Sequence, residues 1–349
     1  MTSQPLNKND HGLFSVAPMM DWTDRHCRYF HRLLSPHARL YTEMLTTGAL
    51  IYGDAPRFLR FHDSEHPVAL QLGGSDPDAL AISARKGQMA GYDEINLNCG
   101  CPSDRVQSGC FGAVLMKSPA LVADCVQAMR REVDIPVTVK CRIAIDEEEE
   151  EPFLDRFIET VAATGCRTFI IHARKAWLKG LSPKENRDIP PLNYDLVSRM
   201  KEKNPQLEII LNGGVQTLAH VENELRRFDG VMIGRAAYQN PWILREIEQT
   251  LFGPQDLPDA RDVIARMAEY ATAEYERYGT PVKSVARHMI GLFQGVPGAK
   301  AWRQALSPLR PENFGMSDPG DGRVLLRIYD SVFGSEGLNP ASINRRIAC

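Results

Sequence analysis

One cysteine of this sequence stands where a thiol can act as an acid. Cys101 lies in the segment 98–102 (Asn-Cys-Gly-Cys-Pro), directly after a short apolar run. Glycine allows a loop unusual backbone angles and proline stiffens it. A single cysteine is more often a small buried hydrophobic residue. The polar residues elsewhere in the chain favour instead a solvent-reachable proton donor at a loop tip.

Seven apolar runs end in polar or small residues, and these are the other candidates for chemistry. They are Pro18 and Met19, Gln71, Asn98, Lys140, His172, Asn212, and Gly234 with Arg235. A (β/α)8 barrel builds its active site at the carboxyl ends of its strands. Seven runs would place such residues at one rim of the barrel, and packing alone does not readily explain this.

The elements that position these residues are short apolar runs alternating with segments of helical spacing. Such alternation indicates parallel βα units. No dinucleotide-binding Gly-x-Gly-x-x-Gly follows the first run, so the sequence predicts an α/β fold with a closed (β/α)8 TIM barrel. The eight predicted strands are 13–17, 40–44, 68–72, 94–98, 137–141, 168–172, 208–212 and 230–234.

Two glycine-containing loops follow the last two predicted strands. Glycine lets main-chain N–H groups approach a phosphate, and an arginine adds a charged contact. The loops are 212–214 (Asn-Gly-Gly) and 234–235 (Gly-Arg). With Lys140 near the centre of the barrel, they suit flavin mononucleotide, FMN. The alternative for Lys140 is an ion pair inside the barrel, with Glu43 as a possible partner.

The sequence pattern changes after the predicted barrel. We expect a disordered segment 1–12, the barrel over 13–249, and a Pro- and Gly-rich linker over 250–261. Helical spacing resumes over 262–306, which predicts a C-terminal all-α domain with basic residues. The segment 307–349 is expected to be an irregular tail.

Composition limits the class of protein. The 349 residues carry a net charge of −3, so a nucleic-acid surface must be a local basic patch. The eight cysteines include no Cys-x-x-Cys pair and no signal-peptide pattern is present, which indicates free thiols and a cytoplasmic location. The spacing of the cysteines and histidines predicts no metal site. No apolar run is long enough to span a membrane.

Several motifs, in order, resemble those of the tRNA-dihydrouridine synthases. Segment 17–25 resembles their opening signature, and 98–103 is similar to their catalytic Asn-x-Gly-Cys-Pro. The loops 212–214 and 234–235 are similar to their FMN-phosphate loops. Segments 41–44, 172–177, 182–187 and 292–299 resemble the A-type branch, so the resemblance runs from about residue 13 to about residue 306.

The resemblance implies an FMN enzyme, reduced by NADPH, that saturates the C5–C6 bond of uridine in the D-loop of tRNA. The A-type branch acts at positions 20 and 20a. Cys101 would donate a proton to C5 while hydride passes from reduced flavin to C6, since the carbon beside the carbonyl needs an acid. The implied cofactor residues are Ala17, Pro18, Met19, Gln71, Lys140, His172, Asn212, Gly213, Gly214, Gly234 and Arg235.

The resemblance also implies a tRNA surface, and the sequence shows no sign of an obligate protein partner. Its residues would be Asn98, Lys184, Arg187, Lys300 and Arg303. The target uridine must swing out of the folded tRNA to reach the flavin. Two alternatives are an FMN-dependent reductase of a free pyrimidine and an RNA-binding or chaperone protein without catalysis. The helical domain argues against the first, and the full set of cofactor residues against the second.

The sequence departs from the family pattern in a few places. Cys99, Cys141 and Ala144 stand where we expect other residues. None of the three belongs to the proposed chemistry, although Cys141 follows Lys140 and can alter its packing. The acidic run 147–151 is expected to lie away from the tRNA.

Overall fold

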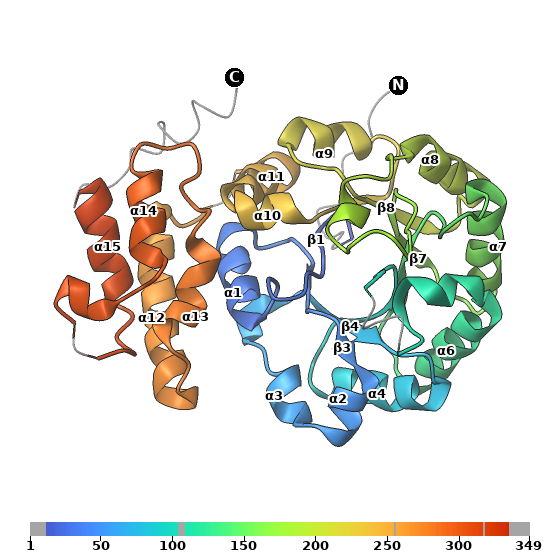
Figure 1. The fold of residues 1–349 in the computed structure, drawn as a ribbon, viewed down its shortest axis with the longest axis horizontal. Coiled ribbons are helices and arrows are strands. Elements are labelled where there is room, and N and C mark those ends of the chain that lie inside the picture. Colours follow the sequence, from blue (N-terminus) through green and yellow to red (C-terminus); the bar gives the residue numbers. More distant parts are fainter. Residues whose placement is uncertain (1–11, 104–108, 255, 317, 335–349) are drawn as a thin grey trace. The chain divides into compact units, whose positions relative to one another are not determined.

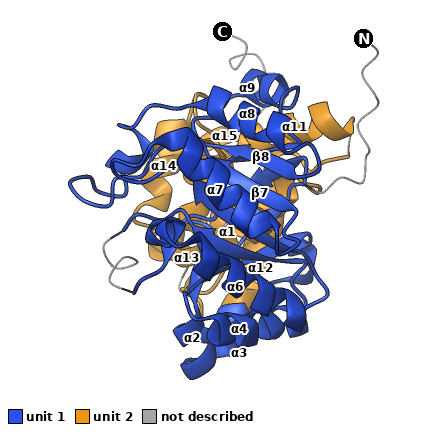
Figure 2. Cartoon of the chain, turned by 90° about the vertical axis from the view of Figure 1, so that its right-hand side faces the viewer, with its two compact units in different colours: residues 1–25, 38–234 blue, residues 26–37, 235–349 orange. Residues whose placement is uncertain are grey.

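The computed structural model describes residues 12–103, 109–254, 256–316 and 318–334. The chain forms two compact units, shown in blue and orange in Figure 2. The first comprises residues 1–25 and 38–234, and the second comprises residues 26–37 and 235–349. The disorder predicted for residues 1–11 lies outside the described residues.

The first unit is a closed parallel barrel (Figure 1). The hydrogen-bonded path is β1-β9-β8-β7-β6-β5-β4-β2, and a parallel bridge between Ser15 and Arg39 joins its two ends. The predicted (β/α)8 barrel is confirmed, and each predicted run overlaps an observed strand. The eight barrel strands are β1 (Phe14–Val16), β2 (Leu40–Tyr41), β4 (Val68–Gly73), β5 (Glu94–Cys99), β6 (Val137–Arg142), β7 (Thr168–His172), β8 (Glu208–Asn212) and β9 (Gly230–Ile233), and the short β3 (Leu45–Thr46) also pairs with β4.

Helices surround this sheet because each buries one apolar side against it. In α6, Val122, Val126 and Met129 are buried at helical spacing, as the sequence predicts. Several helices begin at a side-chain cap; Asp76 Oδ1, for example, accepts from the Ala79 N–H at 2.7 Å. The outer helices are α2 (Thr47–Tyr52), α3 (Ala55–Leu59), α4 (Pro77–Met89), α6 (Pro119–Glu132), α7 (Glu150–Ala162), α8 (Tyr194–Lys203) and α9 (Leu218–Glu224), with 3-10 helices at Asp63–Glu65, Gly112–Lys117 and Glu185–Arg187.

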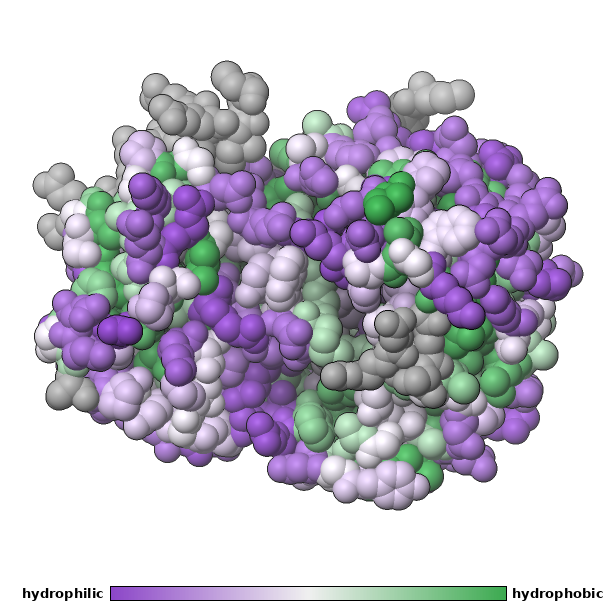
Figure 3. Space-filling view, in the orientation of Figure 1, coloured by the Kyte–Doolittle hydropathy of each residue, from purple (hydrophilic) through white to green (hydrophobic). Residues whose placement is uncertain are grey.

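Charged side chains cover the outside of the barrel. On the face shown in Figure 3, the surface over α7 and α8 is mainly hydrophilic. Glu151 of α7 pairs with Arg199 and Lys203 of α8 at 2.9 Å each. None of the helices in the described part of the chain has the length and apolar character needed to cross a membrane.

The second unit differs from the predicted domain division in its boundaries. It includes α1 (Arg25–Leu34) except for its first residue, together with α10 (Arg235–Gln239) and α11 (Trp242–Phe252). The physical reason is packing: Tyr29 of α1 stacks on Tyr270 of α12 (Ala260–Tyr278) with centroids 4.0 Å apart. Ser35 donates to Glu248 of α11 at 2.6 Å.

The helical character predicted for 262–306 is observed, but helices continue beyond it. After α12 come α13 (Val282–Ala286), a 3-10 helix (Arg287–Met289), α14 (Ala299–Leu306), a 3-10 helix (Pro311–Phe314) and α15 (Val324–Phe333). The prediction of an irregular tail is therefore wrong over α15. Trp302 and Phe293 form an aromatic cluster with Tyr329 and Phe333 of α15.

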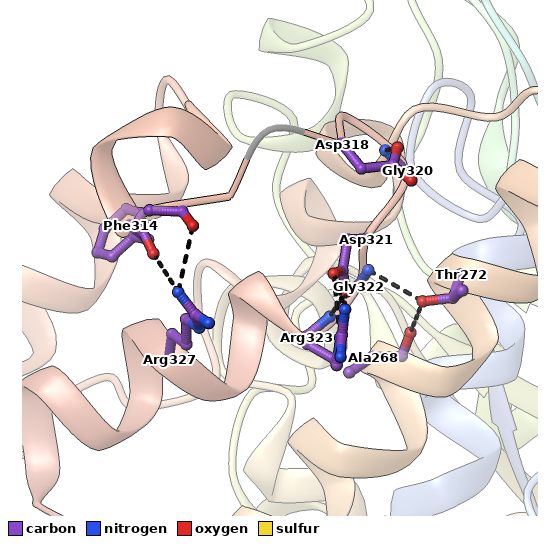
Figure 4. Close-up of polar contacts among 10 residues, drawn as sticks. Ala268, Thr272, Phe314, Asp318, Gly320, Asp321, Gly322, Arg323 and Arg327 are labelled. Atoms are coloured by element: carbon purple, nitrogen blue, oxygen red, sulfur yellow. Dashed lines mark hydrogen bonds and ion pairs between the residues drawn. The ribbon is translucent and has the colours of Figure 1, made fainter.

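Polar contacts hold the segment before α15 (Figure 4). The N–H of Gly322 donates to Thr272 Oγ1 of α12 at 2.9 Å, and Arg327 donates to the Phe314 carbonyl at 2.7 Å. Val324, Leu325 and Ile328 are fully buried. Their spacing is helical, and it is the signal in the sequence by which α15 could have been predicted.

Candidate active site

The Cys101 loop leaves the carboxyl end of β5 and is held on both sides of the cysteine. Asn98 Oδ1 accepts from the N–H groups of Gly100 and Cys101, each at 3.0 Å. The Cys101 carbonyl accepts from the Ala113 N–H at 2.9 Å. The Cys101 thiol lies 3.5 Å from Ser103 Oγ and is partly exposed. This loop therefore presents a positioned thiol at the mouth of the barrel.

Cys99 has the opposite environment. Side chains of a strand alternate between its two faces. Cys99 is fully buried, and of the thiols around it Cys141 has the largest electrostatic effect on it. Burial raises the pKa of the Cys99 thiol well above its ordinary value. Of the two neighbouring cysteines, Cys101 is the one that a ligand can reach.

Lys140 of β6 brings an ammonium group to the same end of the barrel. It pairs in register with Asn98 of β5. Burial lowers the pKa of Lys140 to about 8, and the nearby Arg142 contributes to this shift. The suggested ion pair with Glu43 is wrong: Lys140 makes no ion pair with any described residue, and Glu43 accepts from the Asp21 N–H instead. An unpaired, partly buried ammonium group suits an anionic or electron-rich ligand.

Arg142 is a site residue that our reading of the sequence missed. Its side chain is buried and donates to three main-chain carbonyls: Gly100 at 3.2 Å, Lys175 at 3.4 Å and Asn186 at 2.9 Å. Burial lowers the pKa of Arg142 to about 10. The signal was its place two residues after Lys140, which puts both side chains on the same face of β6.

His172 ends β7 beside these cations. It pairs in register with Arg142 and with Asn212. Burial lowers the pKa of His172 well below its ordinary value, and Arg142 and Lys140 lower it further. His172 is therefore a neutral imidazole at pH 7, able to donate one hydrogen bond and accept another.

The loop after β8 has the geometry of an anion cradle. Gly213 and Gly214 have φ angles of 104° and 75°, which favour glycine. A Cβ at Gly213 would overlap the His172 ring. Within the described residues, the N–H groups of these glycines donate to no protein acceptor. Tyr194 fixes the loop by donating to the Gly213 carbonyl at 2.6 Å.

Apolar residues also pack inside the barrel. Ala17 lies in a buried cluster, and the partly buried Met19 packs against it. Gly234 lies near both, since a Cβ built on it would be 3.9 Å from Met19 Sδ. The other members of this cluster are Tyr41, Ala69, Ile170, Ile210 and Met232. Pro18 is half-buried beside them in the chain.

Comparison with known proteins identifies the family. The family model described as "Dihydrouridine synthase (Dus)" matches residues 15–313. The chain belongs to the dihydrouridine synthase family. The family inferred from the motifs is thereby confirmed.

Several curated dihydrouridine synthases are similar over most of the chain. Proteins named tRNA-dihydrouridine(20/20a) synthase from Shewanella oneidensis, Escherichia coli and Vibrio cholerae are 56%, 58% and 58% identical. The alignments cover 86%, 85% and 84% of this chain, and 90%, 86% and 90% of those proteins.

The residues predicted to contact the substrate of this dihydrouridine synthase lie in both units. Lys184 and Arg187 are exposed in the first, at either end of a short 3-10 segment. The loop that carries them is held by Asn186, whose amide donates to the Trp177 carbonyl at 2.9 Å. Lys300 and Arg303 are exposed on α14 of the second unit. Arg235 begins α10 in that unit, and its role at a phosphate stays a prediction.

Proposed function

We propose that this dihydrouridine synthase reduces uridines at positions 20 and 20a in the D-loop of tRNA to 5,6-dihydrouridine. The observation that carries the proposal is the partly exposed Cys101 thiol, held at a barrel mouth that also presents Lys140 and His172. The names of the relatives support the two positions.

The barrel mouth suits FMN. The φ angles and N–H groups of Gly213 and Gly214 fit a phosphate, and the unpaired Lys140 fits the electron-rich edge of a flavin ring. When bound, FMN supplies the hydride for C6, and NADPH restores its reduced form. The residues that would hold it are Ala17, Pro18, Met19, Gln71, Lys140, His172, Asn212, Gly213, Gly214, Gly234 and Arg235.

Cys101 is the proton donor in this proposal. A proton leaves its Sγ for C5 of the uracil ring, and the thiolate that remains lies within electrostatic reach of Lys140 and Arg142. These two cations stabilise the negative charge that the step leaves on sulfur. The hydrogen bonds to Asn98 and Ala113 keep the main chain of Cys101 in place during the transfer. We also assign Asn98 to contact with the target nucleotide.

Exposed cations would bind the tRNA phosphates. Lys184, Lys300 and Arg303 form no ion pair with any residue in the described ranges. By contrast, Lys201 and Lys203 on the outer face of the barrel are paired with carboxylates. Unpaired cations are available for phosphate contacts, so we assign these three residues to tRNA, together with Arg187 beside Lys184. A cytoplasmic location agrees with the free thiols of the described cysteines.

Nucleoside mass spectrometry tests the proposal. Unmodified tRNA is incubated with the flavin-loaded protein and NADPH, digested, and searched for uridine that has gained two hydrogens. We expect the product at positions 20 and 20a. Reduction of free uridine but not of tRNA would favour the pyrimidine reductase, and tight tRNA binding with no reduced uridine would favour a binding protein.

A further inference from the structure

Five buried polar side chains form an unbroken hydrogen-bonded chain inside the barrel. Asn98 Nδ2 donates to Gln71 Oε1 at 2.8 Å, and Gln71 Nε2 donates to Asn96 Oδ1 at 2.8 Å. Asn96 Nδ2 donates to Thr138 Oγ1 at 2.8 Å, and the Thr138 hydroxyl donates to Glu94 at 2.6 Å. The chain runs from Asn98, near the end of β5, back to the first residue of that strand, Glu94.

The five side chains of this hydrogen-bonded chain are buried. Asn98 is 8% exposed, and the other four side chains are at most 2% exposed. An unpaired polar group is costly in the low-dielectric interior of a protein, so each link depends on the next. The loss of the hydrogen bond to Glu94 should therefore disturb the hydrogen bonds of Asn98.

Both ends of the chain fix its direction. Glu94 lies in an ion pair with Arg39 and also accepts from Tyr41 at 2.8 Å, so its carboxylate acts only as an acceptor. At the other end, the main-chain N–H groups of Gly100 and Cys101 can only donate, and they donate to Asn98 Oδ1. Every side-chain donor between the two ends must then point toward Glu94.

We propose that Glu94 is a positioning residue, which fixes the placement of the Cys101 loop from the opposite end of the barrel. A turn of the Asn98 amide by 180° would set its NH2 group against two N–H donors and release the loop. The carboxylate prevents this because in a reversed chain the Thr138 hydroxyl would turn its proton away and set its oxygen against Glu94 Oε1. The same chain fixes which atoms of the Gln71 amide are left for a ligand.

The placement of Cys101 can be tested without a cofactor or a substrate. Thr138→Val removes the hydroxyl that links Asn96 to Glu94 and keeps the side-chain shape. Thr138→Ser keeps the hydroxyl. Tyr41→Phe removes a donor from the same carboxylate but lies off the path to Asn98, so it is a matched control for the loss of one buried hydrogen bond.

The readout is the rate of alkylation of Cys101 by iodoacetamide in flavin-free protein, measured by peptide mass spectrometry. The exposed Cys110 in the same molecule is the internal reference. Because thiol reactivity follows exposure and local charge, we expect Thr138→Val to raise the Cys101/Cys110 ratio by about threefold or more. Thr138→Ser and Tyr41→Phe should leave the ratio unchanged, and melting temperatures of all three report on global stability separately.

A second variant keeps the test possible if Thr138→Val does not fold. Glu94→Gln turns one acceptor into a donor. Because the Arg39 guanidinium can only donate, it keeps the amide oxygen, the NH2 group faces Thr138, and the ratio should rise in the same direction. The proposal is overturned if a folded Thr138→Val or Glu94→Gln leaves the ratio unchanged, or if Tyr41→Phe raises it equally.

The consequence for catalysis rests on the proposed function. With tRNA and NADPH, Thr138→Val should lower kcat and leave the KM for tRNA unchanged, because the loop and not the tRNA surface is disturbed. A wild-type protein that reduces no tRNA would defeat the proposed function but would leave the alkylation result standing.

Discussion

Cys99 and Cys101 are separated by a single glycine, yet the first is a packing residue and the second is the proposed acid. Cys99 is fully buried as the last residue of β5, and Cys101 is partly exposed beyond the end of the strand. The two residues differ in position: Cys99 lies in the strand, and Cys101 lies in the loop that follows it. Cys99 therefore serves as a control for the first prediction, two residues from Cys101 in the sequence.

Cys101→Ala should lower the rate of tRNA reduction by about 100-fold or more, because it removes only the general acid. FMN binding should be unchanged. Cys99→Ala should cost about 1 kcal/mol of stability and leave the rate nearly intact. Single-turnover oxidation of the reduced enzyme by tRNA measures both variants. A Cys101→Ala enzyme that turns over at the wild-type rate would remove Cys101 from the mechanism.

Lys140 should make the flavin-free protein sensitive to pH. Its pKa falls from the ordinary 10.5 to about 8 on folding because of burial. The unfolded chain therefore binds more protons than the folded chain between pH 8 and 10.5, and the contribution of Lys140 to stability rises with pH across that window. Below the folded-state pKa the buried charge carries its full cost.

Lys140→Met should therefore melt at a higher temperature than the wild type at about pH 7. The difference should shrink as the pH rises from 8 to 10.5. Differential scanning fluorimetry over a pH series on both flavin-free proteins measures it. A difference that stays constant with pH would mean that Lys140 does not titrate in this window.

At the scale of elements, Arg142 joins loops that are distant in the chain. Its acceptors lie in the Cys101 loop after β5 and at two points of the loop after β7, which also carries Lys184 and Arg187. One guanidinium thus connects the proposed acid to the proposed tRNA contacts. Lysine cannot reproduce this planar set of donors.

Arg142→Lys should lower kcat for tRNA reduction by about tenfold, which is the effect of misplacing a catalytic group by a small distance. FMN affinity should change less than kcat. Arg199→Lys is the matched control, because Arg199 pairs with Glu151 on the outer surface. Steady-state kinetics on both variants decide the point, and equal losses in the two would argue against a specific role for Arg142.

The sequence predicted what depends on local pattern. The strands were predictable because buried runs such as Thr168–His172 are short, apolar and β-branched. Cys101, Lys140 and His172 were predictable as site residues because they follow or end such strands. The role of Arg142 was not, because its acceptors lie 33 to 44 residues away in irregular loops. The Asn98-to-Glu94 chain likewise exists only once three strands are in register.

At the scale of the whole molecule, a protein with a net charge of −3 must bind tRNA through local cations. Lys300→Ala with Arg303→Ala should reduce the slope of log K against log salt by about two, because each phosphate that a cation neutralises adds about one to the slope. Lys201→Ala with Lys203→Ala, which removes two paired lysines, should leave the slope unchanged. Filter binding of tRNA over a range of salt concentrations measures both. Equal slopes for all three proteins would place the RNA surface elsewhere.

The second unit combines two distant segments of the chain, 26–37 and 235–349, and this affects how it forms during synthesis on the ribosome. Helix α1 is made early, yet its side chains and those just after it are completed by partners made much later: Ser35 by Glu248 and His26 by Tyr270, 213 and 244 residues further along the chain. The nascent barrel strands can pair in order as they emerge, but α1 must wait with an aromatic face uncovered until α11 and α12 arrive. Slow or stalled translation between residues 38 and 234 would prolong this exposure, and exposed apolar surface makes a growing chain prone to aggregation.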